Sequence, residues 1–297
     1  MASSDIIRML TQTIDKLSES ELRKELFHQY NEGEPLLSAS TLYDIIELAR
    51  AILFPGYYGT PTSHKQTSHH HIKANVEALF NLLVEQILAA LYFITNEPSD
   101  ESGDNKHEEA TRLATEFISK FPDIRNVLAT DVEAAYNGDP AAESLGEVIC
   151  CYPVIRAISN YRIAYELREL GVPLIPRIIT EMGHRETGID IHPGAKIGNY
   201  FTIDHGTGVV IGGTSIIGNN VKLYQGVTLG ARSFPLDTDG KPLKGIPRHP
   251  IIEDNVIIYS NATILGRITV GHDAVVGGNI WVTEDVPPYG RIVQRRG

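Results

Sequence analysis

The sequence predicts an α+β protein in which an N-terminal all-α domain is followed by a parallel β-helix built from hexapeptide repeats. Up to about Leu170 the apolar residues recur with helical spacing, whereas from Ile189 onward Ile and Val recur at every sixth position. A proline-rich interruption of the second pattern predicts one protruding loop. We therefore divide the chain into a helical domain, residues 1–185, and a β-helix domain, residues 186–297, with the loop at 231–250.

Four segments predict the helices. The segment 44–53 has helical apolar spacing and stops at a Phe-Pro-Gly sequence, and the segment 76–94 places its leucines along one side. The segments 108–121 and 144–170 complete the set. A His-rich run at 64–71 is interpreted as a solvated loop between helices, although such runs can also bind metal.

The β-helix is predicted from the period of six, which is neither the 3.6 of a helix nor the 2 of a strand. Each hexapeptide supplies a short strand and a turn, and three of them close one triangular coil whose aliphatic row points inward and stacks on the next coil. Ser215 is the exception among thirteen positions. These positions are Ile191, Ile197, Ile203, Val209, Ser215, Val221, Val227, Ile252, Ile258, Ile264, Val270, Val276 and Val282.

The interruption, residues 231–250, holds four prolines, two glycines and several charges. A segment of this composition cannot continue the coil and must leave it as a loop. Long ordered loops on rigid scaffolds often carry function.

Composition narrows the classes of function. The net charge of −11 argues against a nucleic-acid partner and means that an anionic substrate needs local basic groups. The N-terminus lacks a secretory apolar region, and no run of about 18 apolar residues is present, so we expect no membrane contact and a cytoplasmic protein. The two adjacent cysteines, Cys150 and Cys151, are expected to be buried and unpaired in a reducing compartment.

Polar residues gather at two places in the repeat region. Asp190-Ile191-His192-Pro193 and Asp204-His205-Gly206-Thr207-Gly208 lie in the first coils, and Arg248-His249-Pro250 lies where the loop returns. A coil of strands has no structural need for Asp-His pairs, although solvated corners tolerate them. The pattern therefore favours a site over simple corner residues.

The order and spacing of these motifs, together with Val-Thr-Leu-Gly at 227–230 and the upstream Asp139-Pro140-Ala141 and Tyr161-Arg162, resemble bacterial serine acetyltransferases over about residues 130–285. The resemblance implies a left-handed β-helix and transfer of acetyl from acetyl-CoA to L-serine. The period of six alone is less specific, because other acyltransferases share it.

By this resemblance His205 is the general base that takes the proton of the serine hydroxyl, and Asp190 orients its ring. Arg248 would bind the serine carboxylate, Asp204 and Asp139 its ammonium, and His249 its carboxylate or hydroxyl region. Asp139 is equally explained as a helix cap before Pro140.

The resemblance also places CoA along the coil edges after the loop. Residues 259–261 and 275 depart from the family's pattern, so other basic groups are expected to meet the CoA phosphates. The expected backbone contacts are Gly230, Ala231, Ser260, Asn261 and Gly278, and the candidate phosphate ligands are Arg232, Lys241, Lys244, Arg267 and Arg291.

Several partners follow from the resemblance. We expect a homotrimer or a dimer of trimers, no metal cofactor, and L-cysteine as a feedback inhibitor. The family's docking tail with a terminal Ile is missing, since this sequence finishes at Gly297, so a complex with cysteine synthase is not expected. The alternatives are another small acceptor such as a sugar or amine, a zinc enzyme using His192, His205 and His249, and a scaffold whose site has decayed.

Overall fold

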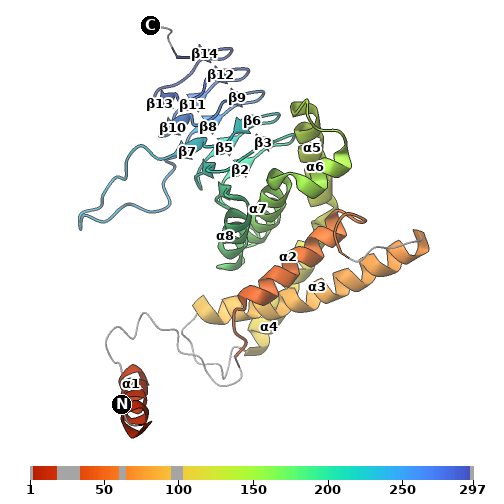
Figure 1. The fold of residues 1–297 in the computed structure, drawn as a ribbon, viewed down its shortest axis with the longest axis vertical. Coiled ribbons are helices and arrows are strands. Elements are labelled where there is room, and N and C mark those ends of the chain that lie inside the picture. The colour runs from red at the N-terminus through yellow and green to blue at the C-terminus, as the bar shows by residue number, and fades with distance from the viewer. Residues whose placement is uncertain (1–2, 19–33, 60–64, 95–102, 295–297) are drawn as a thin grey trace.

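The computed structural model describes residues 3–18, 34–59, 65–94 and 103–294. Its helices precede the strands, and in the part of the chain described there are eight (Figure 1). They are α1 (Ser3–Ser18), α2 (Ala39–Leu53), α3 (Lys65–Ile94), α4 (Gly103–Ser119), α5 (Phe121–Gly138), α6 (Leu145–Cys151), α7 (Pro153–Glu169) and α8 (Ile175–Thr187).

The four predicted helical segments are all helical, but the structure adds to them. Helices α1, α5 and α8 were not among the predicted segments. The segment 144–170 is two helices separated at Tyr152, whose extended backbone precedes a proline that opens α7. The interpretation of 64–71 as a loop is wrong from Lys65 onward, where α3 begins; His64 lies outside the described residues.

Two expectations about the helical domain need correction. Cys150 and Cys151 are free and exposed, not buried, and they are the last two residues of the short helix α6. Residues 70–94 of α3 are long and apolar enough to cross a membrane by composition, alone among the described residues in this. Leu79, Leu83 and Ile87 are nonetheless fully buried against the other helices, as expected for a core helix.

The strands form three parallel sheets that wind about a common core in about five coils (Figure 1). Sheet 1 has the order β1-β4-β7-β10-β13, sheet 2 the order β2-β5-β8-β11, and sheet 3 the order β3-β6-β9-β12-β14. The strands are β1 (Asp190–Ile191), β2 (Lys196–Ile197), β3 (Thr202–Asp204), β4 (Val210–Ile211), β5 (Ile216–Ile217), β6 (Lys222–Tyr224), β7 (Thr228–Gly230), β8 (Ile251–Ile252), β9 (Ile257–Ile258), β10 (Thr263–Leu265), β11 (Thr269–Val270), β12 (Val275–Val276), β13 (Trp281–Val282) and β14 (Arg291–Ile292).

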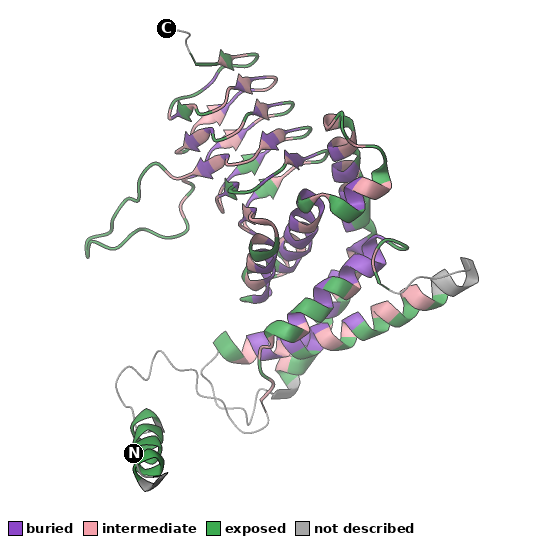
Figure 2. Cartoon of the chain, viewed as in Figure 1, coloured by how far each residue is buried: buried purple, intermediate pink, exposed green. Residues whose placement is uncertain are grey.

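The inward row is buried as predicted except at Ile197, which is partly buried, and Figure 2 shows the buried residues lining the inside of the coils. Its register differs from a constant period of six. Ile191 pairs with Ile211 rather than with Val209, so the step from Ile203 to Ile211 is eight residues. The two additional residues enlarge the corner 204–208.

This shift explains the exception at Ser215. It stands beside Ala195, because the next residues, Lys196 and Ile216, are paired in sheet 2. Both side chains are fully buried in a second row, whose members lie two positions before the inward residue of each strand. Ser215 is therefore a regular member of that row.

Helix α7 closes the first coil. Arg162 makes two hydrogen bonds of 3.1 Å to the buried Asp131 and donates to the carbonyl oxygens of Ile197 and Gly198, both at 2.6 Å. Asp131 in turn accepts the Phe201 N–H at 3.0 Å. These contacts satisfy backbone groups that the end of a coil stack leaves without strand partners.

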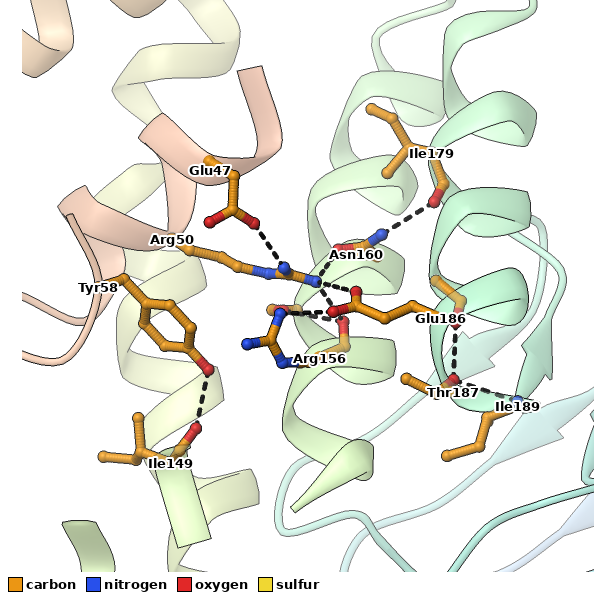
Figure 3. Close-up of polar contacts among 12 residues, drawn as sticks. Glu47, Arg50, Tyr58, Ile149, Arg156, Asn160, Ile179, Glu186, Thr187 and Ile189 are labelled. Atoms are coloured by element: carbon orange, nitrogen blue, oxygen red, sulfur yellow. Dashed lines mark hydrogen bonds and ion pairs between the residues drawn. The ribbon is translucent and has the colours of Figure 1, made fainter. Parts of the chain in front are cut away.

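A buried arginine joins α2 to α7 and α8 (Figure 3). Arg50 Nη2 lies 3.0 Å from Asn160 Oδ1 and 3.2 Å from Glu186 Oε2, and its Nη1 contacts Glu47 at 2.8 Å. Thr187 follows and accepts the Ile189 N–H at 3.2 Å. The network therefore fixes the segment that leads directly into β1.

Candidate active site

The predicted site residues lie on two different corners of the triangular coil. We call the turn region between sheets 3 and 1, residues 204–209, 224–227, 259–262 and 277–280, the His205 corner. The region between sheets 1 and 2, residues 192–195, 212–215 and 230–250, is the His249 corner. The order of the strands in the three sheets sets this division.

The enlarged turn presents His205 to solvent. Its backbone φ is +58°, and its side chain is 78% exposed. Gly206 follows with φ +93°, and a Cβ there would overlap Ile189, so the turn requires glycine. The Nε2 atom of His205 lies 3.7 Å from Asp204 Oδ1. The imidazole is thus open to a substrate and has a carboxylate beside it.

The end of helix α5 brings a second carboxylate to this corner. Asp139 caps the helix and lines a small pocket with Asp204 and Lys222. Its Oδ2 accepts the Tyr152 hydroxyl at 2.6 Å and its Oδ1 accepts the Ala141 N–H at 2.8 Å. These hydrogen bonds hold the pKa of Asp139 below its usual value and raise the pKa of Tyr152 to about 12. Asp139 therefore stabilises a turn and also supplies a fixed negative charge.

Thr214 determines the protonation of His249. The Thr214 hydroxyl oxygen accepts the backbone N–H groups of Arg248 at 2.9 Å and His249 at 3.1 Å, so its own proton is left for His249 Nδ1, 2.8 Å away. The Thr214 N–H also donates to Nδ1 at 3.1 Å. An atom that accepts two hydrogen bonds carries no proton, so the neutral ring keeps its proton on Nε2.

Burial supports the same assignment. His249 is 7% exposed, and burial, helped by the positive charge of Arg248, lowers its pKa to about 4. Gly212 lies against this ring, and a Cβ there would overlap Cδ2 and Nε2. Near neutral pH, His249 is therefore an uncharged N–H donor held in a close-fitting space.

His192 lies on the same corner. A Cβ at Gly213 would come within 2.7 Å of His192 Nδ1, which accepts the Gly194 N–H at 2.9 Å. Burial is the main cause that lowers the pKa of His192. Two adjacent glycines thus leave room for two neutral histidine rings.

Arg248 offers unsatisfied donors. Its Nε is buried and has no hydrogen-bond partner among the described residues, while its guanidinium lies 5.9 Å from the centre of the Phe234 ring. A planar guanidinium held by an aromatic ring is suited to a carboxylate, which it can bind through two hydrogen bonds.

The structure does not join Asp190 to His205 by any hydrogen bond or ion pair between described residues. The Asp190 carboxylate instead faces Arg177 Nη1 at 3.5 Å, on the outer side of sheet 1. That separation is long for a hydrogen bond, and Oδ1 has no hydrogen-bond partner in the described part of the chain. The role of Asp190 as orienter stays a prediction.

The residues expected to contact CoA also divide between the corners. Ser260, Asn261 and Gly278 stack along the His205 corner, where the Ser260 carbonyl accepts the Asn279 N–H at 2.9 Å. Gly230 and Ala231 lie on the His249 corner, at the end of β7 and the start of the loop. Each corner therefore carries part of both expected binding sites.

The basic candidates differ in their surroundings. Arg267 donates to the carbonyl oxygens of Thr214 at 2.7 Å and His249 at 3.0 Å, so it supports the corner. The other four lie in the protruding loop or on the last strand: Arg232, Lys241, Lys244 and Arg291. Which of them meets a phosphate stays a prediction.

The three histidines of the zinc alternative are not gathered within the chain. His205 lies on one corner, and His192 and His249 lie on another. Among the described residues, the group of possible metal ligands that lies close together is Glu181, His184 and Asp190. Both carboxylates of that group are paired with Arg177, whose positive charge disfavours the binding of a metal cation there.

Three residues that contact the predicted site residues were themselves not predicted: Tyr152, Thr214 and Lys222. Each acts on a predicted residue that is distant in the sequence, so no local motif marks it. The Gly-Gly pair before Thr214 was a sequence signal for the close-fitting histidine corner, because consecutive glycines often leave room for a bulky neighbour.

No family model matches the chain. It is 48% identical over 255 residues to a plasmid serine acetyltransferase of Synechococcus elongatus, covering 85% of this chain and 80% of that protein. It is 47% identical over 167 residues to the serine acetyltransferase of Bacillus licheniformis, covering 56% of this chain and 73% of that protein.

Solved structures of serine acetyltransferases are also similar to this chain. Serine acetyltransferase 1 of Entamoeba histolytica in complex with L-cysteine superposes with a TM-score of 0.72 at 32% identity, covering 86% of this chain and 97% of that chain. A soybean serine acetyltransferase complexed with serine gives 0.55 at 27% identity, covering 86% and 96%.

Proposed function

The chain belongs to the serine acetyltransferase family, and from this premise we propose how its two corners divide the reaction. The enzyme transfers the acetyl group of acetyl-CoA to the hydroxyl of L-serine, giving O-acetylserine for cysteine biosynthesis. The observation that supports the division is the contrast between the surroundings of the two histidine rings. His205 is exposed beside carboxylates, and His249 is buried as a neutral donor.

In the proposed reaction His205 is the general base. It takes the proton of the serine hydroxyl as the oxygen attacks the thioester carbonyl carbon. The tetrahedral intermediate then breaks its C–S bond, and the proton passes from the imidazolium to the CoA sulfur. Atoms and charge balance without an acyl-enzyme, so the products are O-acetylserine and free CoA.

The substrate groups are assigned by charge. Asp139 and Asp204 attract the serine ammonium at the His205 corner, and Arg248 binds the carboxylate from the His249 corner. His249 donates from Nε2 to a substrate oxygen. Asp190 is kept as the orienter of His205, a role that requires the two side chains to approach each other when substrate binds.

Two corners of one triangular coil cannot enclose one amino acid, so we propose that neighbouring copies of the chain meet corner to corner. A cyclic trimer places the His205 corner of each copy against the His249 corner of the next. Either a trimer or a dimer of trimers satisfies this requirement.

Mixed assemblies test the shared site. Chains carrying His205→Ala and chains carrying Arg248→Ala are each expected to be nearly inactive, but a refolded or co-expressed equal mixture should regain activity. About one quarter of the sites would then have both native residues, for random cyclic assembly. A mixture no more active than its components would rule out the shared site.

L-Cysteine is proposed as a competitive inhibitor. It has the same ammonium and carboxylate as serine, and the Entamoeba relative is described in complex with it. The expected absence of a cysteine synthase complex stays a prediction, because residues 295–297 lie outside those described. The cytoplasmic location and the absence of a metal cofactor also stay predictions.

The direct test of function is release of CoA thiol from acetyl-CoA in the presence of L-serine. Ethanolamine, which has no carboxylate for Arg248, and 3-hydroxypropionate, which has no ammonium for Asp139 and Asp204, are matched acceptors. We expect turnover with serine and little with either analogue. Equal rates with all three would contradict the proposed recognition of both charges.

A further inference from the structure

Lys222 lies between the two carboxylates that are expected to receive the substrate ammonium. It belongs to β6 and faces outward from sheet 3, beside Thr202 of the coil below. Its side chain is nonetheless only 16% exposed, because the end of helix α5 covers it. A largely buried lysine needs partners for its charge.

The ammonium group has a complete set of them. Its Nζ lies 3.3 Å from Asp204 Oδ2, donates to the Gly138 carbonyl oxygen at 2.7 Å, and lies 4.6 Å from the centre of the Tyr224 ring. Gly138 is the last residue of α5, where free carbonyl groups favour a positive charge. The next residue is Asp139, so one ammonium touches one carboxylate and the backbone that carries the other.

The lysine stays charged in this place. Burial disfavours the charge, but hydrogen bonding to Tyr224 and attraction by Asp204 outweigh it and raise the pKa of Lys222. Two carboxylates and one ammonium give this corner a net charge of −1, which a single substrate ammonium neutralises. Without the lysine the same corner would hold two uncompensated negative charges next to His205.

On the basis of the proposed function, we propose that Lys222 is a positioning residue that fixes Asp204 and the end of α5 and supplies the counter-charge for the acceptor site. With Lys222 in place, Asp204 is held beside His205, and the acceptor site keeps a single net negative charge for the substrate ammonium.

Among the described residues, the charged groups around the acceptor site come from several elements. Asp204 comes from the same turn, Asp139 from the end of α5, and Lys222 from β6. Tyr152 and Glu147, from the segment before α7, complete the surroundings of Asp139. Lys222 supplies the positive charge of this set, so its removal makes the net charge around the acceptor site more negative.

The test compares Lys222→Met with Lys222→Arg in the full-length enzyme. In Lys222→Met the kcat/KM for serine should fall by about tenfold, because Asp204 and the end of α5 lose the charged partner that holds them in place. Lys222→Arg keeps the charge and should retain most of the wild-type kcat/KM. The KM for acetyl-CoA should be unchanged in both.

Several outcomes would overturn the inference. A wild-type kcat/KM for serine in Lys222→Met, or an equal loss in Lys222→Arg, would show that charge compensation is not the role of Lys222. If Lys222→Met fails to fold, Lys222→Gln replaces it with the same expectation. Failure of the wild-type enzyme to acetylate serine would instead reject the proposed function, so the two failures are distinguishable.

Discussion

The two histidine-bearing corners have opposite chemistry although they belong to one repeating scaffold. At the His205 corner two additional residues push the ring out of the coil, where it meets solvent and carboxylates. At the His249 corner glycines and Thr214 enclose the ring, and hydrogen bonds fix its proton on Nε2. A lengthened turn produces an accessible imidazole, and a close-fitting turn produces a fixed N–H donor.

The largest expected effect is the loss of the accessible ring. His205→Ala should lower kcat by about 10²–10⁴-fold, with a smaller change in the KM for serine, because general-base catalysis contributes this much. His272→Ala is the matched control, since His272 lies on the third corner and pairs with Asp273. A kcat within threefold of the wild type would mean that His205 is not the base.

Filling the enclosed corner should have the next largest effect. Gly212→Ala introduces a Cβ that overlaps the His249 ring, so His249 must move and kcat/KM should fall by about tenfold or more. Gly146→Ala is the control, because its new Cβ would lie 3.4 Å from its nearest neighbour, Tyr57. Similar activity in the two variants would show that the position of His249 does not matter.

A smaller effect should separate the two nitrogens of His249. Glutamine can place an N–H near the position of Nε2, whereas asparagine places its amide near Nδ1. We expect His249→Gln to stay within about threefold of the wild-type kcat/KM and His249→Asn to lose about tenfold. The acid limb of the pH profile should be the same in His249→Gln and in the wild type. A shifted limb in His249→Gln would mean that His249 exchanges protons during catalysis.

The smallest effect concerns stability. The pKa of His249 is about 4 in the folded enzyme and 6.5 in an unfolded chain. Between these values the unfolded chain binds a proton that the folded enzyme does not, so stability falls as the pH falls from 6.5 to about 4. His249→Gln removes this contribution, and its Tm should decline less steeply over that range. Parallel Tm curves for the variant and the wild type would contradict the buried neutral state.

The β-helix was predictable because its core repeats, but its register was not. Val209, Val221 and Val227 belong to the row that precedes each strand, and that row is also aliphatic and buried. A count of Ile and Val at every sixth position cannot distinguish the two rows. It therefore does not detect the two additional residues that precede Ile211. The step was visible in the sequence only through Ser215, which stands beside Ala195 in the row that precedes each strand.

The site was predictable where a motif is local and not where it depends on contacts across the fold. His205 and Arg248 stand in short motifs. Lys222 meets Gly138 across 84 residues, and Thr214 meets His249 across 35, so neither contact has a sequence signature. Helix α5 was not predicted for a related reason: its amphipathic pattern is interrupted by Asp131, which is buried because it binds the distant Arg162.

The cap that Arg162 forms on the first coil has a consequence for biosynthesis. A ribosome releases the helical domain before any coil, so α7 can present its guanidinium before residues 190–204 emerge. Each later coil then adds to an edge whose partner strands are already in place, as in the stepwise growth of repeat proteins. The helical domain can thus support the first coil during synthesis, and the later coils can be added in the order in which the ribosome releases them.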